Sequence, residues 1–262
     1  MIDKLYLIPD PNDIKRSEEI ADRWGAAFEY NDFFDPKLLD DETELRRRIE
    51  AYRDHSKKNL GDNLHGVFYD ICLNSCDRKI REISERRVDS SMTIARKLNC
   101  RKVIFHTNFI PGFIPDFYVN GWVNMNADYY KKVCAAYPDM TVCVENMFDF
   151  KPDMLLLLAK EMADVDNFAV CFDVAHINVH GERCEDWIRD LAPYIRHLHI
   201  NDNDGVADLH LPVGDGCVDW KEFFDTVDRY GIDSGMLIEV RGLDDFEKSM
   251  RYLIQRGFVH ER

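Results

Sequence analysis

A regular alternation of short apolar runs and longer segments with helical spacing constrains the fold of this sequence more than any other feature. Buried apolar strands that alternate with helices are typical of a parallel sheet, and eight such units within 262 residues favour closure into a barrel. The sequence therefore predicts one (β/α)8 TIM barrel, with residues 1–262 as a single domain. The expected strands are Lys4–Ile8, Ala27–Asn31, Asp62–Gly66, Lys102–His106, Thr141–Glu145, Phe168–Asp173, Tyr194–Ile200 and Met236–Val240.

Helices are expected between these strands, wherever apolar residues recur at helical spacing. A long loop is expected at residues 108–122, after the fourth strand, and its Phe113 and Trp122 are candidates to cover a site and exclude water. The expected helices are Asp13–Trp24, Asp40–His55, Ile80–Leu98, Asn126–Tyr137, Pro152–Ala163, Cys184–Leu191, Trp220–Tyr230 and Asp244–Gln255.

The segment His197–Gly216 is unusually rich in groups that bind cations. It runs from an apolar strand into a glycine-containing loop, and it carries three histidines and four aspartates: His197, His199, His210, Asp202, Asp204, Asp208 and Asp215. Side chains two residues apart on an extended segment share a face, so His197 pairs with His199, and Asp208 pairs with His210 if the loop is locally extended. A divalent cation explains this composition, and a solvated acidic loop is the alternative.

Ionisable residues also end most of the other predicted strands, where a TIM barrel carries its active site. These residues are His65, His106, Glu145, Asp173, His199 and Glu239, with His176 shortly after Asp173. Each has an ordinary structural explanation, such as a salt bridge, a packed histidine or, for Asp173, a helix cap. Separate structural explanations would leave it a coincidence that all of these residues lie at strand ends. Charged groups at the ends of apolar strands are also costly to bury unless they are paired or bound to metal. A metal site is therefore predicted.

Composition narrows the possible partners. The chain has 49 acidic and 34 basic residues, and its net charge of -15 repels phosphate backbones, so nucleic acid is not an expected partner. The eight cysteines are scattered through predicted strands and helices, no signal-like segment follows Met1, and no run approaches the length of a membrane span. These features predict a cytoplasmic protein with reduced thiols that does not bind membranes.

The same positions carry a resemblance to a known family. The patterns are H-G-x-F-Y at His65, F-H at His106, V-E-N at Glu145, F-D-x-x-H at Asp173–His176, H-x-H-x-N-D around His199, D-x-H-x-P-x-G-x-G at Asp208–Gly216 and I-E at Glu239. As a set they resemble the xylose isomerase-like TIM barrel superfamily, which holds sugar isomerases, ketose 3-epimerases and the DNA-repair enzyme endonuclease IV. Each pattern is weak alone, and the set spans His65 to Glu239.

The resemblance implies roles for individual residues. In the isomerase and epimerase branch, one divalent metal (Zn, Mn, Co or Mg) is bound at the positions matching Glu145, Asp173, His199 and Glu239, and the position matching His176 contacts substrate. In the endonuclease branch, three zinc ions are bound at these positions and at those matching His65, His106, His176, Asp208 and His210. All nine ligand types are present here, so the resemblance leaves both branches open.

The favoured function is a metal-dependent isomerase or epimerase of a sugar or sugar acid, with a small-molecule carbohydrate as substrate. The metal would stabilise an enediolate, and Glu145 and Glu239, on opposite sides of the barrel mouth, are the expected base and acid. His176 and Arg241 are candidates to orient substrate hydroxyls. A homo-oligomer is possible. The alternatives are an endonuclease IV-like zinc phosphodiesterase acting on abasic DNA, which the net charge disfavours, and a metal-binding barrel without catalysis.

Overall fold

The computed structural model describes residues 2–260, and its strands form a closed barrel in the order β1 to β8. The strand pairs within it are parallel, which confirms the predicted (β/α)8 fold. The strands are β1 (Ile2–Leu7), β2 (Ala26–Tyr30), β3 (Asn63–His65), β4 (Lys102–His106), β5 (Thr141–Glu145), β6 (Phe168–Asp173), β7 (Ile195–Ile200) and β8 (Ser234–Ile238).

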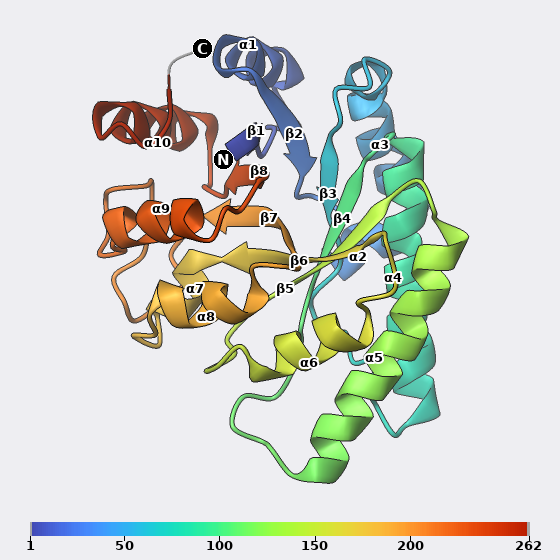
Figure 1. Cartoon of the computed structure of the whole chain (residues 1–262). Coiled ribbons are helices and arrows are strands. Elements are labelled where there is room, and N and C mark those ends of the chain that lie inside the picture. The colour runs from blue at the N-terminus through green and yellow to red at the C-terminus, as the bar shows by residue number, and fades with distance from the viewer. Residues whose placement is uncertain (1, 261–262) are drawn as a thin grey trace. The chain divides into compact units, whose positions relative to one another are not determined.

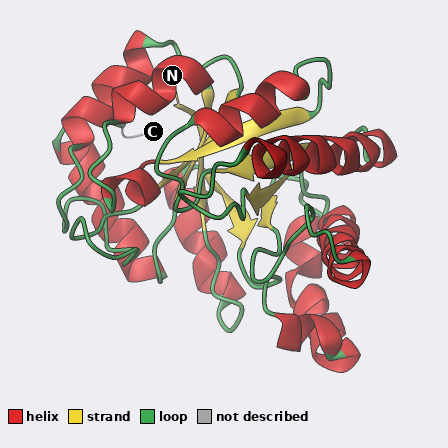
Figure 2. Ribbon diagram, turned by 90° about the horizontal axis from the view of Figure 1, so that it is seen from below, coloured by secondary structure: helices red, strands yellow, loops and turns green. Residues whose placement is uncertain are grey.

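Helices alternate with the strands along the chain. Figure 2 draws the helices in red and the strands in yellow. Several begin at an aspartate whose side chain accepts hydrogen bonds from the first turn, as Asp13 does for α1 and Asp77 for α4. The helices are α1 (Ile14–Trp24), α2 (Pro36–Asp40), α3 (Glu42–Ser56), α4 (Arg78–Lys97), α5 (Asp116–Ala136), α6 (Asp153–Glu161), α7 (Val174–Asn178), α8 (Cys184–Leu191), α9 (Trp220–Arg229) and α10 (Leu243–Gln255).

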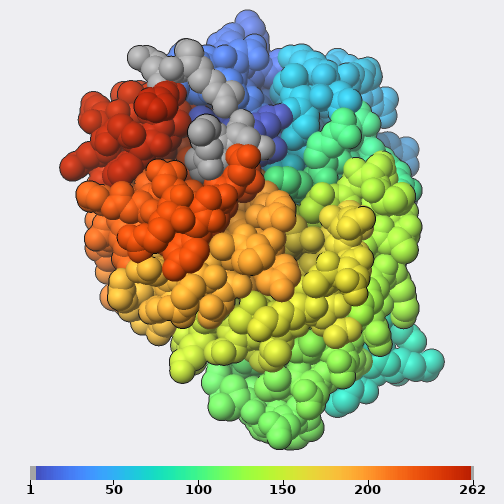
Figure 3. Space-filling model, in the orientation of Figure 1, coloured from blue at the N-terminus to red at the C-terminus, as the bar shows by residue number. Residues whose placement is uncertain are grey.

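The chain divides into two compact units. The first, unit 1, contains the described residues up to Glu29, residues 146–152 and residues from Cys171 onward. Within it, β1 pairs with β2 and β8, and β7 pairs with β8. Helices α1 and α10 lie side by side (Figure 1). Helices α9 and α10 are orange and red in Figure 3. Both carry exposed charged residues, such as Lys221 on α9 and Lys248 on α10.

The second unit, unit 2, contains residues 30–145 and 153–170. Its strands β3, β4 and β5 pair in register, with Leu64 opposite Val103 and His106 opposite Glu145. The four residues that follow the first position of β4 and of β5 are all buried, as expected for strands covered on both faces. The register places the last residues of these two strands next to each other.

The predicted loop at residues 108–122 is partly wrong, because α5 begins at Asp116. The start of this helix combines aromatic and β-branched residues with Asn120 and Gly121, which have low helix propensity, so its pattern is weak in the sequence. Tertiary contacts stabilise it instead. Trp122 is only 1% exposed, and its Nε1 donates to the carbonyl oxygen of Thr107 at 3.2 Å. Trp122 is therefore a core residue rather than a mobile cover.

Several further boundaries differ from the prediction, among them those of the second expected helix and of the last strand. The helix expected at Asp40–His55 is α3, which begins at Glu42 because the side chain of Asp41 caps it by accepting from the backbone of Thr43 and Glu44. The short helix α2 that precedes it was not predicted. Strand β8 ends at Ile238 instead of Val240. Glu239 follows the strand directly, and its N–H still donates to the carbonyl oxygen of Ile200 at 2.9 Å, so the side chain remains at the end of β8.

Within residues 2–260, no helix has both the length and the apolar character that are needed to cross a bilayer.

Five of the eight cysteines are buried: Cys100, Cys134, Cys143, Cys171 and Cys184. Burial raises the pKa of the Cys134 thiol to about 12, so this side chain acts as a small apolar group in the core.

Candidate metal centre

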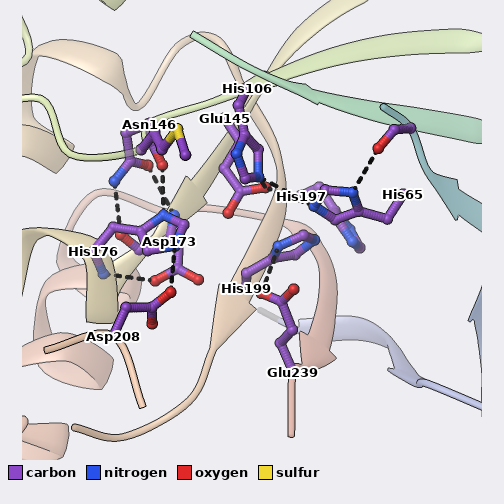
Figure 4. Close-up of polar contacts among 12 residues, drawn as sticks. His65, His106, Glu145, Asn146, Asp173, His176, His197, His199, Asp208 and Glu239 are labelled. Carbon is purple, nitrogen blue, oxygen red and sulfur yellow. Dashed lines mark hydrogen bonds and ion pairs between the residues drawn. The ribbon is translucent and has the colours of Figure 1, made fainter. Parts of the chain in front are cut away.

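Three acidic and imidazole side chains meet at the strand ends of unit 1. Asp173 ends β6, His199 is the penultimate residue of β7, and Glu239 follows β8. They offer ligand atoms within 4.8 Å of one another, and none of the three is more than 5% exposed. His199 Nδ1 lies 3.2 Å from Glu239 Oε2 (Figure 4). Two carboxylates and an imidazole that are buried close together form a set of donors suited to a divalent cation.

Asp173 is held in place by hydrogen bonds to both its backbone and its side chain. Its Oδ1 accepts from the N–H groups of Ala175 at 2.6 Å and His176 at 3.0 Å, so it caps the short helix α7, which was not predicted. Its Oδ2 accepts from Asn201 Nδ2 at 3.3 Å. Asn146 bridges to the Asp173 backbone in both directions, at 2.8 and 2.9 Å. The cap uses Oδ1, so capping alone does not exclude a cation at Oδ2.

A second group in unit 1 joins His176, Asp208 and His210. Asp208 Oδ2 lies 3.1 Å from His210 Nε2. It also lies 3.6 Å from His176 Nε2 (Figure 4). Burial alone would raise the pKa of Asp208, but His176 and His210 outweigh it and hold this pKa well below its usual range. Burial would lower the pKa of His210, yet the carboxylates of Glu239 and Asp208 raise it to about 9. Asp208 and His210 meet as predicted, although His210 has a left-handed φ of 50° and the loop is not extended there.

A third group lies in unit 2 and consists of His65, His106 and Glu145, which end β3, β4 and β5. Their ligand atoms lie within 4.8 Å of one another, and the three residues are 2%, 9% and 0% exposed. The Nε2 atoms of the two histidines are 3.1 Å apart, and His106 Nε2 is 3.5 Å from Glu145 Oε2. Phe68 stacks on His106 with a centroid distance of 4.8 Å. This group also has the donor chemistry of a metal site.

Backbone carbonyl groups orient three of these histidines. The Nδ1 atoms of His65, His176 and His210 lie 3.0, 2.7 and 3.0 Å from the carbonyl oxygens of Gly66, Asn146 and Glu239. A carbonyl oxygen only accepts, so each Nδ1 donates its proton and each Nε2 faces the cluster. Metal-binding histidines are commonly oriented in this way.

The other aspartates of the predicted cation-binding segment have structural roles. Asp202 is fully buried and accepts hydrogen bonds from the loop that follows it. Asp204 is exposed and accepts from the N–H groups of Val206 and Ala207 in a turn. Asp215 pairs with Lys248 of α10. Of the four aspartates in the segment, only Asp208 contacts histidine side chains, so the candidate ligands form a smaller part of the segment than its composition predicts.

Gly216 allows this loop to pack closely on itself. A Cβ atom at this position would overlap the carbonyl oxygen of Asn203 and the carboxylate of Asp202. Since one of these contacts is backbone, we expect Gly216→Ala to destabilise the protein by about 1–3 kcal/mol in urea unfolding. Gly121 is the matched control, because a Cβ there meets nothing within 4 Å. An equal midpoint for Gly216→Ala and wild type would contradict the packing explanation.

Two residues near these groups were not predicted as functional, and two of the predicted residues are exposed. Asn146 is the last residue of the V-E-N pattern, and Glu29 is a fully buried carboxylate in β2 that contacts His197 and His199. A charged residue in an otherwise apolar strand was the available signal for Glu29. Arg241 is exposed, in the turn before α10, and Phe113 is 41% exposed beside Tyr118.

Comparison with known proteins agrees with this architecture. Residues 19–256 match the family described as xylose isomerase-like TIM barrel. The uncharacterized protein MJ1311 of Methanocaldococcus jannaschii is 26% identical over 252 residues, which cover 91% of this chain and 81% of that protein.

Solved structures share the fold at low sequence identity. The TTHB071 protein from Thermus thermophilus, soaked with ZnCl2, has a TM-score of 0.78 at 23% identity and covers 98% of this chain and 99% of its own. D-allulose 3-epimerase from Methylomonas sp. has a TM-score of 0.71 at 15% identity, and the match covers 97% of each chain. Because the family match covers most of its length, the chain belongs to the xylose isomerase-like TIM barrel family.

Proposed function

We propose that this protein is a divalent-metal-dependent isomerase or epimerase that acts on a small sugar or sugar acid. The observation that carries the proposal is the convergence of Asp173, His199 and Glu239, three buried side chains with ligand atoms within 4.8 Å of one another. The fold shared with D-allulose 3-epimerase supports the substrate class, and the ZnCl2-soaked TTHB071 structure supports a divalent metal.

The proposed metal ligands are Glu145, Asp173, His199 and Glu239. Imidazole and carboxylate donors suit Zn, Mn, Co or Mg. All four side chains are buried, and a bound cation would neutralise the charges of the three carboxylates. When bound, the metal supplies Lewis-acid polarisation of a substrate carbonyl and its neighbouring hydroxyl.

The proton transfers are assigned to Glu145 and Glu239. One carboxylate removes the proton from the carbon beside the carbonyl, and the other returns a proton to the opposite face in epimerisation. The low exposure of both residues, 0% and 5%, keeps bulk water away from these transfers. His176 and Arg241 are the proposed hydroxyl-binding residues. The Nδ1 atom of His176 donates to the carbonyl oxygen of Asn146, so its Nε2 atom faces Asp208.

Solvent isotope exchange tests this proposal. Protein loaded with Mn²⁺ or Zn²⁺ in D2O is expected to introduce deuterium at a carbon next to the carbonyl of at least one ketose or aldose, with D-allulose first in the panel. NMR detects both the exchange and the new epimer. Chelation of the metal should abolish exchange, and added metal should restore it. Loaded protein that gives no exchange across a broad panel would count against the proposal.

The groups His65–His106–Glu145 and His176–Asp208–His210 favour one second candidate, a multi-zinc phosphodiesterase acting on abasic DNA. Five residues of metal-binding type lie outside the proposed ligand set Glu145, Asp173, His199 and Glu239: His65, His106, His176, Asp208 and His210. Metal analysis separates the two functions. About one tightly bound metal per chain supports the sugar enzyme, whereas three zinc ions together with nicking of abasic duplex DNA support the nuclease. The net charge of -15 disfavours DNA binding.

A further inference from the structure

We propose that Glu29 is a positioning residue whose carboxylate orients His199 for metal binding. The inference rests on the proposed function, in which His199 is a metal ligand. Glu29 lies in β2, within the apolar sequence AFEY, and its side chain is 0% exposed. A carboxylate buried in a strand needs polar partners that compensate for its lost hydration.

The two oxygens of Glu29 contact two imidazole rings. Oε2 lies 2.7 Å from His197 Nε2, and Oε1 lies 2.9 Å from His199 Nε2. His197 Nε2 donates a hydrogen bond to Glu29. The ionised oxygen 2.9 Å from His199 Nε2 favours a proton on that nitrogen as well, because the negative charge stabilises the N–H. A neutral imidazole has one N–H, and His199 therefore keeps the lone pair of Nδ1. That Nδ1 faces Glu239, 3.2 Å from Oε2.

Packing around His197 fixes the other end of this arrangement. Its ring packs edge-on against Tyr6, with centroids 5.2 Å apart, and against His199, at 5.1 Å. Gly235 leaves space for Tyr6, because a Cβ at this position would lie 2.6 Å from Tyr6 Cε2. His197 is itself fully buried. His197 therefore fixes the position of Glu29 through Oε2, and Glu29 orients the ring of His199 through Oε1.

Metal affinity is the property that this role controls. Carboxylates that orient a metal-binding histidine typically contribute about 10- to 100-fold to metal affinity. We expect Glu29→Gln to weaken Mn²⁺ or Zn²⁺ binding by about this factor in chelator competition, because glutamine keeps the shape and loses the charge. The Co²⁺-loaded variant should also show a shifted visible absorption spectrum.

A matched control separates orientation from a general loss of stability. Ser249 is also fully buried, and its hydroxyl accepts from Val213 N–H and donates to the carbonyl oxygen of Asp245, away from His199. Ser249→Ala should lower the unfolding midpoint and leave metal affinity unchanged. Equal loss of affinity in both variants would overturn the proposal.

Nitrogen NMR of the wild-type protein provides a test that needs no variant to fold. In zinc-loaded, 15N-histidine-labelled protein, His199 is expected to have Nε2 protonated and Nδ1 bound to metal. The opposite assignment would overturn the role of Glu29. Wild-type protein that binds no metal would overturn the proposed function and this inference together. Tight wild-type binding that Glu29→Gln leaves unchanged would overturn this inference alone.

Discussion

Replacement of Glu239 by glutamine is expected to lower kcat by about 10²- to 10⁴-fold, the usual contribution of a general acid or base. Glutamine keeps the size of the side chain, and the backbone N–H of residue 239 still donates to Ile200, so the fold should be retained. The amide cannot carry a proton between substrate faces. Deuterium exchange into the substrate measures the loss, and circular dichroism checks the fold.

The control for this variant is Glu247→Gln on α10, where Glu247 pairs with Arg23. Its kcat should stay within about twofold of wild type, because an ion pair at the surface contributes little. Metal content separates the two roles of Glu239. Lost turnover with retained metal supports proton transfer, and lost metal supports a ligand role. Undiminished turnover would remove Glu239 from the mechanism.

Much of the architecture could be predicted from local sequence. The strands β4, β5 and β6 have the predicted boundaries, because each is an apolar run that stops at an ionisable residue. The same signal identified His106, Glu145 and Asp173 as strand-end residues. Barrel topology then predicts which strand ends share one face, and local spacing alone cannot do this.

Other features depend on contacts between residues that are distant in sequence. The first turns of α5 are stabilised by the burial of Trp122 and its bond to Thr107, which no helical pattern records. Glu29 lies 168 residues before His197, so a single charge in a strand could not reveal its partner. The division of the loop aspartates into structural and candidate ligand residues likewise depends on the path of the folded loop.

Asp202→Ala is expected to destabilise the protein by about 4 kcal/mol, because it leaves several buried donors unsatisfied and each costs about 1–3 kcal/mol. Asp202 Oδ1 accepts from the N–H groups of Asn203 at 3.0 Å and Val218 at 3.1 Å. Its Oδ2 accepts from Gly214 N–H and from Trp220 Nε1, both at 2.8 Å. One carboxylate thus closes the loop between β7 and α9. Urea unfolding monitored by circular dichroism measures the change.

Asp204→Ala is the control, since Asp204 is two residues away but exposed, and its variant should unfold at nearly the wild-type midpoint. The loop closed by Asp202 also carries Asp208 and His210, so Asp202→Ala should weaken any metal binding that depends on them. Asp202→Asn keeps an oxygen acceptor and should recover part of the stability. If Asp202→Ala and Asp204→Ala were equally stable, the carboxylate of Asp202 would not be what holds the loop, and its burial would need another explanation.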